Sequence, residues 1–162
     1  MAQRRRAVKT VADQGASLCV DASVGVKWVL GDEEGSAASL ALLERHVVGD
    51  IRIIVPDLFL HEVGNALMLA VRRKGVPEAA ALEALGALVD LHLPAVPIGP
   101  LATSALTLGL RLGLSFYDAA YLAVAEDHGI PLITVDKQLL ETDLPWILGL
   151  DDVQPYLDQG SS

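Results

Sequence analysis

The stretch Leu18-Cys19-Val20-Asp21-Ala22-Ser23 begins with three apolar residues and continues with an acid, Asp21. Ser23, two residues further on, can cap a helix. Pro131-Leu132-Ile133-Thr134-Val135 repeats the pattern and ends in Asp136. Short apolar strands that alternate with helices predict an α/β fold around a parallel sheet. Ligands of such sheets bind at the carboxyl ends of the strands. If the two strands are neighbours, Asp21 and Asp136 therefore face one pocket. Each acid also has a purely structural interpretation, Asp21 as a helix cap and Asp136 as a turn residue.

The rest of the chain continues the alternation of helices and strands. Helices are predicted over residues 23–30, 36–48, 57–74, 77–91, 101–112 and 116–127. Further strands are predicted over residues 51–55 and 95–98, with an edge strand over 147–153. Asp57 is the expected cap of the third helix. At 162 residues, the chain fits one domain over residues 17–155, preceded by a basic arm over 1–16 and followed by a loose tail over 156–162.

The composition narrows the class of protein. Hydrophobic residues make up 52% of the chain, which is enough to build a core. Twenty-one acids against twelve bases give a net charge of −9, which disfavours a generic polyanion binder. The single Cys19 excludes an internal disulfide and a multi-cysteine zinc site, and it fits a reducing compartment such as the cytoplasm. Three prolines interrupt the uncharged stretch over residues 91–110, so we expect no membrane span there.

Positive charge is concentrated at the start of the chain, at Arg4, Arg5, Arg6 and Lys9. Without residues 1–10, eight bases stand against 21 acids, a net charge of −13. The basic arm is interpreted as a solvated tail, with contact to RNA or to a partner as the alternative.

Two further acids stand on predicted helices. Glu62 lies at the edge of the apolar face of its helix, so its carboxylate is paired, bound to a metal or extended toward solvent. Asp118 opens a helix that is apolar all round and therefore buried. Ser115 and Asp118 also have the spacing of a capping box, and this role is compatible with a functional one.

Four acids on four different elements form a more informative pattern than any one of them. Clustered carboxylates repel one another, and a divalent cation relieves that repulsion. An all-oxygen set of ligands suits Mg²⁺ or Mn²⁺ rather than zinc. Mg²⁺ held by few carboxylates keeps waters, one of which can attack a phosphodiester. Asp21, Glu62, Asp118 and Asp136 therefore indicate metal-dependent phosphoryl chemistry. The competing zincin motif fails, because Asn65 stands where His61-Glu62 would need a second histidine.

Four segments together resemble the PIN-domain ribonucleases, in particular the VapC-type toxins. The likeness covers roughly residues 18–153 in the order and spacing of that family. The segments are Leu18–Trp28, His61–Leu67, Ser115–Ala125 and Leu132–Asp136.

The resemblance implies a three-layer α/β/α sandwich around a mainly parallel sheet. It implies RNA cleavage that depends on Mg²⁺ or Mn²⁺, a cognate antitoxin that blocks the site, and a homodimer. The family's metal ligands correspond to Asp21, Glu62, Asp118 and Asp136, directly or through water. Asn65 and Thr134 would orient these carboxylates, with Ser23 as a further supporting residue. An antitoxin with a basic segment would suit the acidic pocket.

Two features of the chain depart from the pattern of the PIN-domain ribonucleases, and two other functions are alternatives to RNA cleavage. The sixteen residues before Ser17 form a longer N-terminal segment than is usual in that family. Basic candidates for RNA contact within the body are few: Lys27, Arg72, Arg73 and Lys74. One alternative function is a catalytically silent PIN-like binding module. The other is a phosphoacceptor receiver domain, although such a domain needs paired acids after its first strand and this chain has Asp21 alone.

Overall fold

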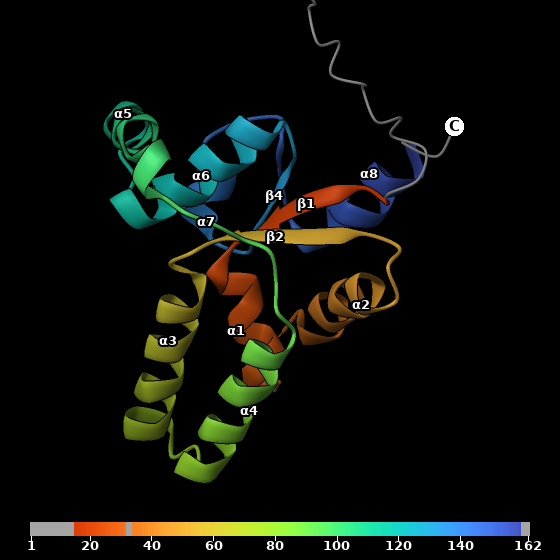
Figure 1. Ribbon diagram of the computed structural model, residues 1–162, viewed down its shortest axis with the longest axis vertical. Coiled ribbons are helices and arrows are strands. Elements are labelled where there is room, and N and C mark those ends of the chain that lie inside the picture. The colour runs from red at the N-terminus through yellow and green to blue at the C-terminus, as the bar shows by residue number, and fades with distance from the viewer. Residues whose placement is uncertain (1–14, 32–33, 160–162) are drawn as a thin grey trace, which may run out of the picture.

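A parallel sheet of five strands forms the centre of the molecule in the computed structural model, which describes residues 15–31 and 34–159 (Figure 1). The basic residues of the predicted N-terminal arm up to position 14 lie outside this description. The strand order is β3-β2-β1-β4-β5, and every pairing between neighbours is parallel. The strands are β1 (Ser17–Val20), β2 (Arg52–Pro56), β3 (Ala95–Val96), β4 (Leu132–Ile133) and β5 (Ile147–Leu148).

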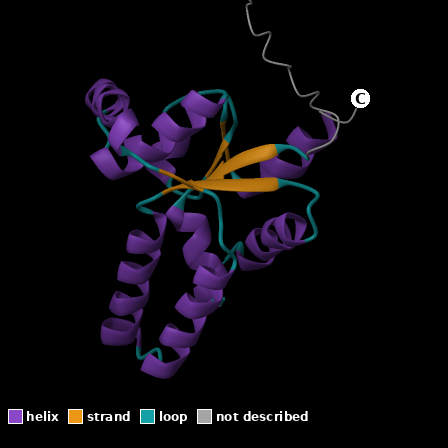
Figure 2. Ribbon diagram, in the orientation of Figure 1, coloured by secondary structure: helices purple, strands orange, loops and turns teal. Residues whose placement is uncertain are grey.

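Helices cover both faces of the sheet, which confirms the three-layer α/β/α architecture (Figures 1 and 2). One face carries α1 (Ala22–Leu30), α2 (Ser36–Val47), α3 (Phe59–Lys74) and α4 (Glu78–Asp90). The other carries α5 (Ala102–Leu112) and α6 (Phe116–His128). The short α7 (Lys137–Leu140) follows β4, and α8 (Val153–Gln159) follows β5. Two 3₁₀ turns complete the described elements, one over Gly99–Leu101 before α5 and one over Leu150–Asp152 before α8.

The strand order brings β1 and β4 side by side at the centre of the sheet, although Leu132 lies 111 positions after Asp21 in the sequence. From β1 the chain runs through β2 and β3 in one direction, and β4 and β5 lie on the opposite side of β1. The crevice at such a reversal is where open α/β sheets bind ligands. The condition for a shared pocket of Asp21 and Asp136, that the strands before them are neighbours, is therefore met.

Helix α6 is the central element of its layer. Seven consecutive residues, Ala119 to Ala125, are buried, and the helix contacts β1, β2 and β4. This explains why its sequence is apolar all round. On the opposite face α1 packs closely on α3, because a Cβ atom at Gly25 would lie only 2.4 Å from Cζ of Phe59. These contacts fix the helix starts that carry the acids.

Three predicted details differ from the structure. The predicted edge strand over residues 147–153 is wrong beyond Leu148: Gly149 leads into the 3₁₀ turn, and α8 begins at Val153. We predict the domain to end at residue 155, but this helix continues past it. Val153 and Leu157 are spaced by four residues, so they share one face of the helix, and both are buried in the core. Asp57 does not cap α3; its carboxylate accepts from the backbone N–H of Ile98 at 3.3 Å and so tethers the chain beyond β3.

The uncharged stretch over residues 91–110 is divided among a turn after α4, strand β3 and most of α5. In the described part of the chain, no helix combines the length and the hydropathy that a membrane crossing needs.

Candidate active site

Asp21 begins the site at the carboxyl end of β1. Its backbone N–H donates to the carbonyl of Ile133 on β4 at 2.9 Å, so the residue is held between the two central strands. The side chain is only 5% exposed and caps α1. Three donors converge on Oδ2: the backbone N–H of Ser23 at 3.2 Å, the hydroxyl of Ser23, and the hydroxyl of Thr134 at 3.0 Å. The capping role of Asp21 is thus real, and Oδ1 receives none of these hydrogen bonds.

Ser23 and Thr134 connect the ends of β1 and β4. The Ser23 hydroxyl accepts from the backbone N–H of Val135 at 3.2 Å, and the Thr134 hydroxyl accepts from that of Asp136 at 3.0 Å. Thr134 is fully buried, so its one hydroxyl binds both Asp21 and the backbone of Asp136. Both hydroxyls therefore tie the segment that follows β4 to the start of α1, and that of Thr134 links Asp21 to the backbone of Asp136.

Asp136 follows β4 at the same edge of the sheet. Its Oδ1 accepts from the backbone N–H groups of Gln138 at 2.8 Å and Leu139 at 3.3 Å, so it caps the short α7. Strand β4 ends at Ile133, so the predicted strand over residues 131–135 is longer than the observed one, and Asp136 stands three residues beyond it at the start of α7.

Glu62 approaches from α3 and is half-buried. Its Oε2 accepts a 2.6 Å hydrogen bond from the hydroxyl of Tyr121 on α6. Burial raises the pKa of Tyr121 above its usual value, and the neighbouring Glu62 raises it further, so the hydroxyl keeps its proton and remains the donor. Tyr121 is not among the site residues predicted from the sequence, although a tyrosine among small apolar residues needs a partner for its hydroxyl.

Asp118 begins α6 one turn before Tyr121. Ser115 caps this helix by accepting from the backbone N–H of Asp118 at 3.1 Å, and its hydroxyl donates to Asp118 Oδ2 at 2.6 Å. The predicted pairing of Ser115 with Asp118 is confirmed, and it holds the carboxylate at the start of the helix.

The charges of Asp21, Glu62 and Asp118 affect one another. Burial raises the pKa of Asp21, its hydrogen bonds to Ser23 and Thr134 oppose that rise, and the charge of Asp118 adds to it. Burial also raises the pKa of Glu62; the hydrogen bond from Tyr121 opposes this, and the charges of Asp21 and Asp118 add to it. Asp136 is not among the charges that raise either pKa. The fold therefore brings Asp21, Glu62 and Asp118 close enough to repel one another.

This donor set fits a hydrated divalent cation of the magnesium type. The groups are carboxylate oxygens that repel one another, and a cation between them would remove the repulsion. Within residues 15–31 and 34–159, no three His, Cys, Asp or Glu side chains are close enough to enclose an ion by themselves. Mg²⁺ is commonly held by one or two carboxylates together with several waters, so the arrangement suits a cation bound partly through water.

Comparison with known proteins identifies the family. The family model of the PIN domain matches residues 18–144. The chain belongs to the PIN domain family.

Relatives of this PIN domain include proteins of known structure. Ribonuclease VapC3 of Pyrobaculum aerophilum is 32% identical over 126 residues, which is 76% of this chain and 92% of that protein. The crystal structure of PAE2754 from the same organism superimposes with a TM-score of 0.64 at 26% identity, covering 89% of this chain and 96% of that one. A toxin–antitoxin complex from Klebsiella pneumoniae has a chain of the same fold, with a TM-score of 0.52 at 18% identity over 82% of this chain and 97% of that one.

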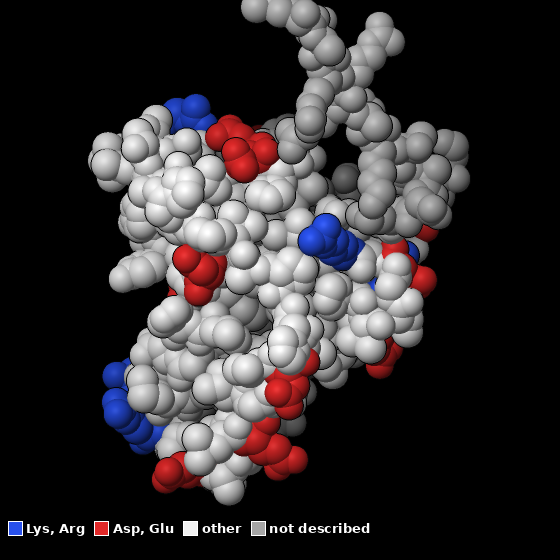
Figure 3. Space-filling view, in the orientation of Figure 1, with Lys and Arg blue, Asp and Glu red and all other residues white. Residues whose placement is uncertain are grey.

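In the described part of the chain, no hydrogen bond joins the remaining predicted residues to the acids of the PIN domain. Asn65 is exposed one turn beyond Glu62, and in the described part of the chain no hydrogen bond joins the two. Lys27 is buried, and its ammonium group donates to the backbone carbonyl of Glu34, so it is not a surface cation for RNA. The basic residues of the last turn of α3 are exposed and gather at the far end of that helix (Figure 3): Arg72, Arg73 and Lys74.

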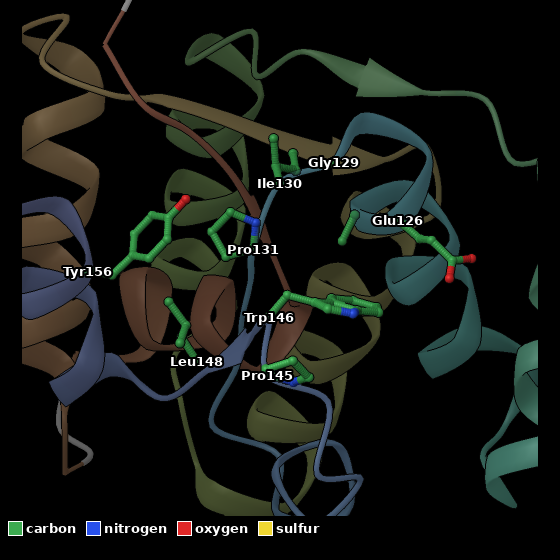
Figure 4. A pocket seen from close by; sticks show the side chains of 9 residues that line it. Glu126, Gly129, Ile130, Pro131, Pro145, Trp146, Leu148 and Tyr156 are labelled. Atoms are coloured by element: carbon green, nitrogen blue, oxygen red, sulfur yellow. The ribbon is translucent and has the colours of Figure 1, made fainter. Parts of the chain in front are cut away.

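A pocket of about 340 Å³ lies at the opposite end of the strands (Figure 4). It is formed where Pro131 precedes β4 and Trp146 precedes β5, with Tyr156 of α8 on its wall. Glu126 is the one acid among the residues that line it. The pocket is therefore separate from the acids, which follow the strands at their carboxyl ends.

The pKa shifts predict that the metal-free PIN domain loses stability as the pH rises. An acid whose pKa is higher in the folded chain than in the unfolded one stabilises the fold while both states are protonated. That contribution is lost as the pH rises from the ordinary values, 3.8 for Asp21 and 4.5 for Glu62, through the raised folded values. In buffer with EDTA, the melting temperature should therefore fall across this range, and Asp21→Asn should reduce the fall. A variant that melts with the wild-type pH dependence would contradict the shift at Asp21.

Proposed function

We propose that this PIN domain is a metal-dependent endoribonuclease and the toxin of a toxin–antitoxin pair. The observation that carries the proposal is the placement of the acids: Asp21 and Asp136 follow the neighbouring strands β1 and β4 at one edge of the sheet. Glu62 of α3 is hydrogen-bonded to Tyr121, which lies one turn after Asp118 on α6. A family relative, VapC3, is a ribonuclease by name, and 92% of its length aligns with this chain.

Asp21, Glu62 and Asp118 would hold Mg²⁺ or Mn²⁺, with Asp136 contributing through water. When bound, the cation would activate a water and stabilise the charge that develops on the phosphate. Thr134 and Ser23 keep the Asp21 carboxylate in place by hydrogen bonds to Oδ2. The fold would thus contribute to catalysis by holding these four acids at fixed positions around one reacting phosphate.

RNA would reach the acids across an otherwise acidic body. Arg72 and Arg73 are exposed and stand ten or more residues beyond Glu62 on α3, about 15 Å along the helix. This spacing suits contact with a phosphate several nucleotides away from the scissile one. Their contribution would be general affinity that weakens with salt, because phosphate contacts carry no sequence information.

The partner of the toxin would be an antitoxin with a basic segment. A guanidinium group in the acidic pocket would neutralise Asp21, Glu62 and Asp118 in the place of the cation. We also propose a homodimer, since exposed apolar side chains such as Leu106 and Leu110 stand on α5, and we propose the reducing cytoplasm as the compartment.

A catalytically silent binding module is the second candidate. It is favoured by the observation that no three acidic side chains in residues 15–31 and 34–159 enclose an ion position. In that case the acids would serve only to bind a basic partner.

The test is cleavage of a circular RNA, which an exonuclease cannot degrade. The purified chain should linearise the circle in Mg²⁺ or Mn²⁺ and should be inactive in excess EDTA. Binding of a basic peptide without any cleavage in either metal would favour the silent module.

A further inference from the structure

We propose that Tyr121 is the positioning residue that fixes the Glu62 carboxylate for metal binding. The inference rests on the proposed function. The contact that carries it is the hydrogen bond from the Tyr121 hydroxyl to Glu62 Oε2, at 2.6 Å. No part of the Tyr121 side chain is exposed, so its hydroxyl has no access to water and its direction is fixed by packing.

Tyr121 connects α6, on which it lies, with α3 and with β1, the strand that precedes Asp21. It lies on α6, one turn after Asp118. Its hydroxyl reaches α3 at Glu62, and its backbone carbonyl accepts from Cys19 Sγ on β1 at 3.8 Å. Cys19 stands two residues before Asp21. A shift of Glu62 relative to the other acids would therefore require a shift of a fully buried side chain.

The hydrogen bond constrains a flexible carboxylate. Glu62 is half-buried and has three rotatable side-chain bonds, so without a partner it would sample several positions near the mouth of the site. With Oε2 held by Tyr121, the second oxygen, Oε1, is the one left for a cation or its water. Groups that orient a metal ligand in this way commonly change metal affinity 10- to 100-fold when they are removed.

Tyr121→Phe removes the hydroxyl and keeps the buried ring. We expect the dissociation constant for Mn²⁺, measured by electron paramagnetic resonance of the free ion, to rise about 10-fold. RNA cleavage should slow at limiting Mn²⁺ and recover its wild-type kcat at saturating Mn²⁺. A role in packing alone would lower the melting temperature and leave the Mn²⁺ affinity unchanged.

Two further variants separate this role from others. Tyr156→Phe deletes the same hydroxyl on α8, beside the pocket at the opposite end of the strands, and should bind Mn²⁺ like the wild type. In a Glu62→Ala background, Tyr121→Phe should have no further effect on Mn²⁺ affinity, because its action passes through Glu62.

The outcomes distinguish this inference from the function on which it rests. Wild-type Mn²⁺ affinity in Tyr121→Phe, or an added loss in the Glu62→Ala background, overturns the positioning role alone. A wild-type chain that binds no Mn²⁺ and cuts no RNA overturns both proposals. If Tyr121→Phe does not fold, a crystal structure of the wild type with Mn²⁺ replaces this experiment. A hydrogen bond between Tyr121 and Glu62 in that structure would support the positioning role. A Glu62 side chain turned away from Tyr121 would overturn it.

Discussion

Asp118→Asn is expected to lower RNA cleavage by roughly 10³-fold while the fold survives, because a charge next to the metal is worth several kcal/mol in the transition state. The amide keeps an oxygen that can accept from the Ser115 hydroxyl, and the backbone cap of α6 does not involve the side chain of residue 118. What disappears is one of the charges that repel Asp21 and Glu62. Cleavage rates at saturating Mg²⁺ and thermal melting in EDTA measure the two effects separately.

The control for this variant is Asp127→Asn, at the other end of α6. Asp127 lies 3.6 Å from Nδ1 of His128, far along the helix from the acids, and its loss should leave cleavage unchanged. A folded Asp118→Asn variant that cuts RNA at the wild-type rate would remove Asp118 from the site.

Thr134→Val is the second variant with a large expected effect. Valine has the shape of threonine without the hydroxyl, so the variant removes a donor to Asp21 and the acceptor for the backbone N–H of Asp136. Residue 134 is fully buried, and a buried polar group that loses its partner costs about 1–3 kcal/mol. We also expect cleavage to fall about 10- to 100-fold, because Thr134 holds the carboxylate of Asp21, one of the ligands in the proposed metal site. Denaturant unfolding and RNA cleavage measure the two losses.

Two threonine variants serve as controls for Thr134→Val. Thr134→Ser keeps the hydroxyl and should retain most of the activity. Thr107→Val, on the exposed side of α5, removes only a bond to the carbonyl of Thr103 and should change neither measurement. Equal stability of Thr134→Val and the wild type would contradict the bridging role of Thr134.

Much of the sheet is predictable because its strands are short apolar runs with an acid or a proline at the end. Whether β1 and β4 are neighbours is left open by that pattern; the structure pairs them, and the hydroxyl of Thr134 then reaches Asp21. The end of the chain is less predictable, because Val153 and Leu157 serve an amphipathic helix as readily as a strand. Gly149 and the acids of the 3₁₀ turn are the signals that favour the helix.

The candidate site is only partly readable from the sequence. The four acids stand out because each opens or ends an element, but their separations depend on how α3 and α6 pack on the sheet. The link between Tyr121 and Glu62 joins residues 59 positions apart and needs this packing to be known. Lys27 is a residue that the sequence includes wrongly: it is predicted as a candidate for RNA contact, and its side chain is buried.

The most direct test of the account is the anomalous diffraction of Mn²⁺ in crystals of the intact chain. We predict one Mn²⁺ peak at the carboxyl ends of β1 and β4, with oxygens of Asp21, Glu62 and Asp118 as ligands, directly or through one water. A peak elsewhere, or none at Mn²⁺ concentrations that support cleavage, would contradict the shared-cation site.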